Sequence, residues 1–206
     1  MVGGVYYLTN QLLKNKNSKK TTMTLFNLIA SDYKKYKKYG GEFFTIIFFT
    51  QGFSAIFQYR VAHQIYTGFK LPLFRQVLLV FCNLWNKWIE ISTGISIPKS
   101  ALIGHSFYIG HFGGIILNAN TVIGSNCNIS QGVTIGVSGS NDKRGVPIIG
   151  NDVYIGVNAV VAGKIIVGNN VLIGSCSLVI KDVHDNCVVS GVPAVVISEN
   201  GSKGYI

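Results

Sequence analysis

The sequence predicts a mainly β protein in which short strands stack into a triangular prism, preceded by an α-helical region. Two observations carry this prediction: a six-residue repeat in the second half of the chain, and a change of composition near residue 91. Eighteen of the 24 glycines lie beyond residue 90, whereas 12 of the 18 Lys and Arg residues lie before residue 91. The two parts of the chain therefore have different architectures.

The first part carries helical signals. Residues 1–20 are rich in lysine, and we expect them to form a mobile basic lead-in. Residues 21–90 are expected to form an α-helical N-terminal region, because apolar residues recur there at helical spacing. Gly40 and Gly41 end a first helix, and further helical stretches are predicted at about 43–67 and 72–90.

The second part, residues 91–198, carries the repeat, and residues 199–206 form a C-terminal tail. A β-branched residue recurs at every sixth position, and only a step of eight after Ile115 and a step of fourteen after Ile135 break the period. A helix cannot keep such residues on one face, whereas three short strands per coil point each of them into a narrow core. The predicted inward positions are 91, 97, 103, 109, 115, 123, 129, 135, 149, 155, 161, 167, 173 and 179. A polar loop at 137–147 fills the longer step.

Residues three repeats apart should stack vertically in such a prism. The position two places after the inward residue then gives one column: Thr93, His111, Gln131, Val157 and Ser175. His111 is the candidate general base, because a neutral imidazole can take a proton from a hydroxyl near physiological pH. A histidine that merely decorates an outward turn is the alternative interpretation. A prism edge has no deep pocket, so a site is expected between copies, and three copies suit a triangular section.

Composition excludes several classes of function. A net charge of +10 fits a nucleic-acid binder, but the predicted fold offers no element that reads a groove. A three-histidine zinc site is not expected, because His105 and His111 lie on different faces. The four cysteines form no C-x-x-C motif, and we expect reduced thiols. No secretion signal is recognised, and the apolar stretch 43–57 is short of the ~20 residues of a spanning helix, so a cytoplasmic location is expected.

Several segments resemble the hexapeptide-repeat acyltransferases, and within them the serine acetyltransferase-like group. They are YRVAH (59–63), YIGHFGGIIL (108–117), ISQGVTIG (129–136), GVPIIGNDVYIG (145–156), IKD (180–182) and GVPAVVIS (191–198). The similarity covers about residues 40–206 and is nearest in character to homologues of capsule and exopolysaccharide biosynthesis. It implies a left-handed parallel β-helix, a homotrimer, acetyl-CoA as co-substrate and no metal.

The resemblance also implies roles for individual residues. His111 matches the catalytic histidine, and Lys181 would contact a CoA phosphate. The implied cofactor contacts are Gly136, Val157, Ser175, Ile180, Lys181, Gly191 and Pro193. The substrate or orienting candidates are Ser96, Gln131, Asp142 and Arg144, with Glu90 as a further carboxylate that could orient His111. A backbone N–H near residues 131–136 is expected to stabilise the oxyanion.

Departures from the family pattern bear on the acceptor. Gly110 replaces an acidic residue before the histidine, Gly145 replaces a histidine after Arg144, and Ser96 replaces the orienting aspartate. The acidic residue of the family's helical region aligns near 39–41, where this chain has none. Since these groups would hold a zwitterionic amino acid, their loss disfavours serine. The sequence therefore predicts an acetyl-CoA-dependent O-acetyltransferase acting by direct attack on a hydroxyl of a capsular or exopolysaccharide sugar.

Other interpretations stay open at this stage. The first is a serine O-acetyltransferase of cysteine biosynthesis, and a second, from another class, is a non-catalytic β-helix scaffold. The saccharide acceptor could be lipid-linked or polymeric. The basic helical region is expected either to contact an anionic membrane surface or to be a solvated face over packed helices.

Overall fold

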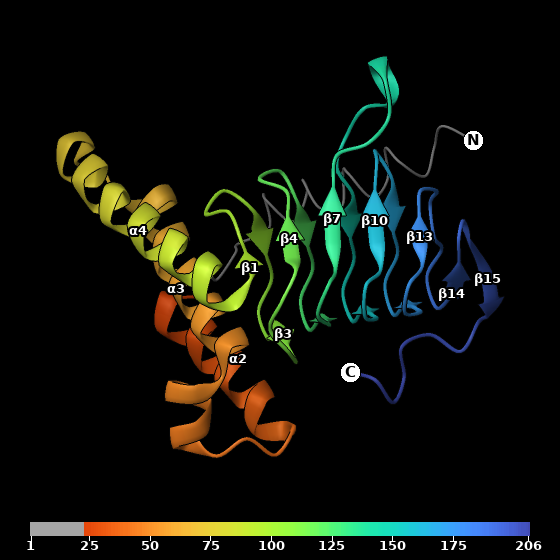
Figure 1. Cartoon of the computed structure of the whole chain (residues 1–206), viewed down its shortest axis with the longest axis horizontal. Helices are drawn as coiled ribbons and strands as arrows, with labels where there is room; N and C mark the ends of the chain where they lie inside the picture. Colours follow the sequence, from red (N-terminus) through yellow and green to blue (C-terminus); the bar gives the residue numbers. More distant parts are fainter. Residues whose placement is uncertain (1–22) are drawn as a thin grey trace.

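The computed structural model describes residues 23–206, so the lead-in predicted at 1–20 lies outside the described residues. A small group of helices covers one end of a prism of short strands (Figure 1). Within residues 23–206 no helix is long and apolar enough to cross a membrane.

The helical region contains three α-helices and one π-helical segment. They are α2 (Leu25–Lys38), η1 (Thr45–Phe49), α3 (Gln51–Gly68) and α4 (Pro72–Thr93). Proline in the first turn and Gly94 in the left-handed conformation after the last turn delimit α4. The stretch predicted as one helix at 43–67 is divided at Thr50, which adopts an extended conformation between η1 and α3. Ile91 lies on α4 and is exposed, so its predicted inward position was wrong.

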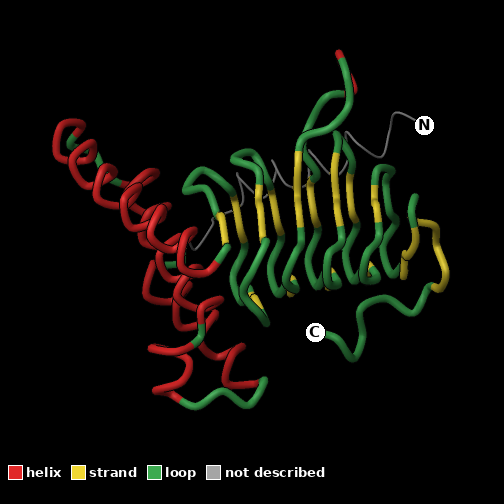
Figure 2. Tube along the Cα trace, viewed as in Figure 1, coloured by secondary structure: helices red, strands yellow, loops and turns green. Residues whose placement is uncertain are grey.

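Three parallel sheets form the faces of the prism (Figure 2). Sheet A contains β1 (Ile95–Ser96), β4 (Ile115–Leu117), β7 (Thr134–Gly136), β10 (Val160–Ala162) and β13 (Leu178–Val179). Sheet B contains β2 (Leu102–Ile103), β5 (Val122–Ile123), β8 (Ile148–Ile149) and β11 (Ile166–Val167). Sheet C contains β3 (Tyr108–Ile109), β6 (Asn128–Ile129), β9 (Tyr154–Ile155), β12 (Leu172–Ile173), β14 (Val188–Gly191) and β15 (Ala194–Ser198). Among the strands of the described residues, β14 and β15 are the one antiparallel pair.

The core is the predicted β-branched column with one shift of register. Every predicted inward position from 97 to 179 is at most 8% exposed. However, Leu117 pairs with Ile135, and Ile115 pairs with Ile95. The two extra residues of this coil therefore lie before β4, in the corner 110–114, and not after Ile115 as predicted. Spacing alone could not place them, because Ile115 and Leu117 both point inward.

A buried ion pair joins the helices to the first coil. The Arg60 guanidinium donates from Nε to Asp32 at 2.8 Å and from Nη1 and Nη2 to the carbonyls of Ile103 and Gly104 at 2.7 and 2.6 Å. Asp32 in turn accepts the backbone N–H of Phe107 at 2.8 Å. Both side chains are almost fully buried. This network fixes α2 and α3 against the end of the prism.

The rest of the YRVAH segment serves the same packing. The Tyr59 hydroxyl donates to the carbonyl of Ala101 at 2.8 Å and accepts the N–H of Ile103 at 3.2 Å. His63 Nδ1 lies 2.8 Å from the carbonyl oxygen of Lys99. These contacts give the motif a structural role in this chain.

Strand β3, which leads into the corner of His111, is braced by two helices. The Tyr36 hydroxyl of α2 donates to the carbonyl of Ile109 at 2.9 Å and accepts its N–H at 3.2 Å. Gly52 of α3 packs directly on the same backbone, so that a Cβ there would overlap the Ile109 carbonyl oxygen and come within 2.9 Å of Tyr36 Oη. Only glycine allows this approach.

We expect Gly52→Ala to lower the free energy of unfolding by about 1–3 kcal/mol, because the added methyl group forces α3 away from β3. Chemical denaturation followed by circular dichroism measures the change. Gly136→Ala is the matched control, since a Cβ at Gly136 meets nothing nearer than 3.8 Å. Equal stabilities of the two variants would contradict the close packing argued for Gly52.

Candidate functional site

His111 lies in an exposed bulge between β3 and β4. Gly113 donates its N–H to the carbonyl of Thr93 at 2.9 Å, and its own carbonyl accepts the N–H of Gly132 at 2.8 Å, so the backbone at 113 is part of the regular stack. Gly113 and the next residue both have positive φ, +101° and +66°. His111 and Phe112 are the two extra residues of this coil, and both are exposed. The insertion therefore lifts the histidine out of the prism wall.

The structure contains a column of stacked residues along this edge, as predicted, but His111 is not part of it. The N–H of Asn158 donates to Gln131 and the N–H of Cys176 donates to Val157, at 2.9 and 2.7 Å. These bonds stack Thr93, Gly113, Gln131, Val157 and Ser175. The shift of register moves His111 two residues away from the column and leaves it beside it, at the same edge.

The same edge ends in the turn between β14 and β15. Gly191 donates its N–H to the hydroxyl of Ser177 at 3.2 Å, and the turn continues through the exposed Val192 and Pro193 to Ala194. Neighbouring coils are roughly 4.8 Å apart. His111 and the turn thus lie at two ends of one strip, which suits an elongated ligand.

Gln131 offers an unused acceptor within this strip. Its side-chain Oε1 is buried and accepts no hydrogen bond from the described residues. A buried acceptor without a partner costs free energy, so a ligand N–H that reached it would be stabilised. Gln131 was singled out from spacing, whereas its unpaired oxygen could not be known from the sequence.

The other predicted cofactor residues lie at a different edge. Gly136 ends β7 and Ile180 and Lys181 follow β13, so all three lie where sheet A turns toward sheet B. His111, Val157 and Ser175 lie at the opposite edge, where chain from sheet C enters sheet A. One copy of the chain therefore does not bring the predicted cofactor set together.

The loop 137–147 projects from the edge of Gly136 (Figure 1). Ser138 and Gly145 close its base with two backbone hydrogen bonds of 3.1 Å, and the short helix η2 (Asn141–Lys143) forms its tip. Asp142 and Arg144 are both exposed on it. The loop carries these two candidate residues away from the His111 edge of their own chain.

Packing explains one departure from the family pattern, Gly145, but not another, Gly110. A Cβ at Gly145 would lie 2.6 Å from Cβ of Lys164, so this glycine is required by the packing of the loop base. A Cβ at Gly110 would lie 3.4 Å from the Tyr108 ring, an ordinary contact. Gly110 is therefore not imposed by packing.

Ser96 is joined to a carboxylate. Its hydroxyl donates to Oε1 of Glu90 at 2.7 Å, and Glu90 also accepts from Asn86 at 2.9 Å and from Lys87 at 2.6 Å. Although burial raises it, the pKa of Glu90 is lowered overall by the hydrogen bonds from Lys87 and Ser96 and by the Lys87 charge. The last turns of α4 thus place an ionised carboxylate against β1. The family resemblance named Ser96, and Glu90 was a further candidate carboxylate, but the sequence could not show that the two side chains meet.

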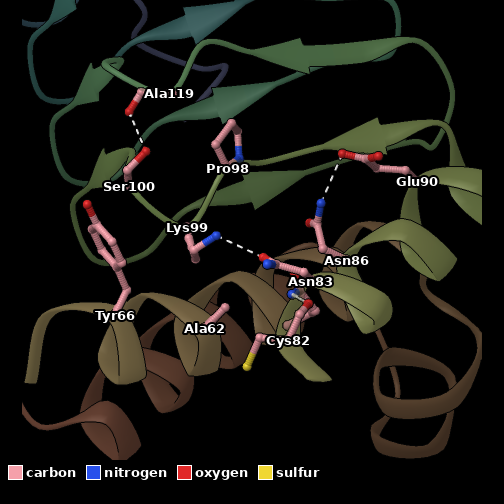
Figure 3. Close-up of a pocket in the computed structure, with 11 residues that line it drawn as sticks. Ala62, Tyr66, Cys82, Asn83, Asn86, Glu90, Pro98, Lys99, Ser100 and Ala119 are labelled. Atoms are coloured by element: carbon pink, nitrogen blue, oxygen red, sulfur yellow. Dashed lines mark hydrogen bonds between the residues drawn. The ribbon is translucent and has the colours of Figure 1, made fainter. Parts of the chain in front are cut away.

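Glu90 also lines a polar cavity of about 370 Å³ between α3, α4 and the first coil (Figure 3). In this cavity Lys99 donates to Asn83 at 2.8 Å and Ser100 donates to the carbonyl of Ala119 at 2.9 Å. Asn86 points from α4 toward Glu90 in the same view. Across residues 23–206 no group of three or more His, Cys, Asp or Glu side chains could hold a metal ion.

Comparisons with known proteins agree with this architecture. Residues 147–181 match the family model described as bacterial transferase hexapeptide (six repeats). The serine acetyltransferase of Bacillus subtilis is 34% identical over 162 residues, which are 79% of this chain and 71% of that protein. The serine acetyltransferase of Synechococcus elongatus is 35% identical over 152 residues, 74% of this chain, and the chain spans only 59% of its length.

Solved structures give the same result. Neisseria gonorrhoeae serine acetyltransferase superposes with a TM-score of 0.74 at 27% identity, over 87% of this chain and 68% of that one. A serine acetyltransferase in complex with CoA superposes with a TM-score of 0.69 at 26% identity, over 88% of this chain and 73% of that one. The predicted fold class, a left-handed parallel β-helix with N-terminal helices, is confirmed.

The predicted transfer to a capsular or exopolysaccharide sugar is contradicted by these relatives, and nearness to capsule homologues finds no support. The prediction counted side chains missing at aligned positions, Gly110 and Ser96 among them. A residue missing at an aligned position can be replaced from another element, as Glu90 does where it accepts the Ser96 hydroxyl, so such a count does not decide the acceptor. The relatives favour the stated alternative instead. The chain belongs to the serine acetyltransferase family of hexapeptide-repeat transferases.

Proposed function

We propose that this protein transfers the acetyl group of acetyl-CoA to the hydroxyl of serine, with His111 as the general base. The observation that carries the proposal is the bulge that exposes His111 at the end of a strip with an unpaired buried acceptor. The relatives that are serine acetyltransferases, and the similar structure in complex with CoA, support the choice of substrates.

The proposed reaction moves one proton in two steps, from the serine hydroxyl to His111 and from His111 to the CoA sulfur, and it needs no covalent enzyme intermediate. His111 takes the hydroxyl proton of serine as the oxygen attacks the thioester carbonyl. The tetrahedral intermediate then expels the CoA sulfur, which receives that proton, giving O-acetylserine and free CoA. The N–H groups of Gly132 and Thr134 already donate within the prism, at 2.8 and 3.0 Å, so they are not free to stabilise an oxyanion. For the other residues of 131–136, stabilisation of the oxyanion by a backbone N–H stays a prediction.

An elongated thioester fits the strip. Val157 and Ser175 contribute small side chains to the strip. Gln131 Oε1 is buried without a partner, so it would accept an amide N–H of the pantetheine arm once the side chain turns outward. Lys181 lies at the other edge of sheet A, so its contact with a CoA phosphate requires a neighbouring copy. A closed trimer, in which the edges of adjacent copies meet, supplies that contact.

The function is tested by release of free thiol from acetyl-CoA with purified full-length protein. We expect release that depends on serine and yields O-acetylserine by mass spectrometry, with threonine and a no-acceptor reaction as controls. Thiol release that is absent, or that is the same without serine, would overturn the proposed function.

We expect Glu90→Gln to lower the free energy of unfolding by about 1–2 kcal/mol, because the ionised carboxylate accepts hydrogen bonds from Ser96, Asn86 and Lys87. Urea denaturation followed by circular dichroism measures the change. Glu199→Gln, an exposed acid on the C-terminal tail, is the matched control. Equal stabilities of the two variants would contradict the role of these hydrogen bonds in joining α4 to β1.

A further inference from the structure

The outward side of α4 is apolar along its whole length. Its exposed side chains recur at spacings of three and four, which places them on one side of a helix. This outer arc of α4 consists of Leu73, Phe74, Val77, Val80, Phe81, Leu84, Trp88 and Ile91, with exposed fractions from 48% to 81%. Single exposed apolar residues are common on proteins, whereas a continuous surface of this kind marks an interaction site.

The apolar surface extends beyond α4 in both directions. At one end, the tip between α3 and α4 exposes Phe69 and Leu71, and this tip projects far from the prism (Figure 1). Near the other end, Trp88 borders an apolar groove of about 280 Å³, which Ile47 of η1 and Phe57 of α3 also line. The exposed phenylalanines beside Ile47 continue it, at positions 43, 44, 48 and 49.

Positive charge accompanies this surface. Described residues 23–93 contain eight Lys or Arg and three Asp or Glu, whereas residues 94–206 contain six and five. Lys70 is exposed at the tip, and α2 exposes Lys34, Lys37 and Lys38. Lys87 on the flank of the outer arc is 67% exposed, but its charge is paired with Glu90 at 2.6 Å. The charge that the sequence shows is thus concentrated in the part of the molecule that carries the apolar surface.

We propose that the outer arc of α4 and the α3–α4 tip dock on a bilayer that carries anionic headgroups. An amphipathic helix with aromatic and aliphatic residues on one side, in a region of net positive charge, lies in the plane of such an interface. Anionic lipids attract each basic residue near the surface. A second copy of the chain is disfavoured as the occupant, because pairing two such faces brings like charges together.

The test is flotation of the full-length protein with vesicles of phosphatidylcholine alone or of phosphatidylcholine with phosphatidylglycerol. We expect binding to the mixed vesicles, little to the neutral ones, and weakening as salt rises. The double variant Phe81→Glu/Leu84→Glu should reduce binding by roughly tenfold or more, because it removes two apolar insertions and adds two negative charges. The matched control is Val195→Glu/Ile197→Glu on β15, whose side chains are similarly exposed.

Sedimentation velocity without vesicles accompanies the flotation, and circular dichroism shows whether each variant is folded. The proposal is overturned if the wild type fails to bind anionic vesicles, or if both double variants bind equally. It is also overturned if the variant at 81 and 84 dissociates an oligomer while the wild type ignores lipid, because the face would then join copies of the chain. None of these readouts depends on acetyl transfer, so the docking and the proposed function fail or succeed separately.

Discussion

Replacing His111 by alanine is expected to lower kcat for acetyl transfer by about 10²–10⁴-fold, the usual contribution of a positioned general base. The imidazole has the exposure that this role requires, because two extra residues lift it from the prism wall beside the Gln131 column. Binding of acetyl-CoA should change little, since the proposed contacts of the cofactor lie along the strip and not on the imidazole. Steady-state kinetics and calorimetric titration with CoA measure the two effects.

His105→Ala is the matched control for that experiment. His105 is also exposed in a corner of the prism, but at the turn between sheets B and C, where its Nδ1 contacts Ser106. We expect this variant to keep the activity of the wild type. Near-normal kcat in His111→Ala, with His105→Ala equally active, would remove His111 from the mechanism.

The prism could be predicted because its core is a local property of the sequence. Each strand of a coil needs one β-branched residue, and the alternation of side-chain directions along the strand points that residue into the core. The prediction failed at the one coil where this local rule allows two registers. Ile115 and Leu117 both point inward, so the extra residues could be counted on either side of them, and only the pairing with β7 decides. The consequence for the site is direct, because the misplaced residues are His111 and Phe112.

The structure brings together only part of the predicted site residues. Val157 and Ser175 stack as expected, whereas Gly136 and Lys181 lie at the opposite edge of sheet A. The contact between Ser96 and Glu90 depends on how α4 meets β1, which no spacing along the chain encodes. The acceptor was misjudged because it was inferred from side chains missing at aligned positions, whereas the relatives are serine acetyltransferases.

The ion pair between Asp32 and Arg60 should give the largest effect on stability. Arg60→Met is expected to lower the free energy of unfolding by about 3–5 kcal/mol, the usual cost of leaving a buried charge without its partner. The loss includes two carbonyls of the first coil, which then lack the guanidinium donors. The double variant Asp32→Asn/Arg60→Met should lose less stability than Arg60→Met alone, because no buried charge remains.

The pH dependence separates the charge from the packing. Burial already raises the pKa of Asp32 in the wild type, although the charge and hydrogen bonds of Arg60 oppose this. Without Arg60, the folded-state pKa of Asp32 rises further above its unfolded value, so the folded protein binds the extra proton. The penalty of Arg60→Met should therefore be full at neutral pH and shrink as the pH falls through that raised pKa. Urea denaturation between pH 5 and 8 measures the trend, and the double variant, with no carboxylate at position 32, should lack it. A penalty independent of pH in Arg60→Met would show that lost packing and hydrogen bonds, and not the isolated charge, account for the whole effect.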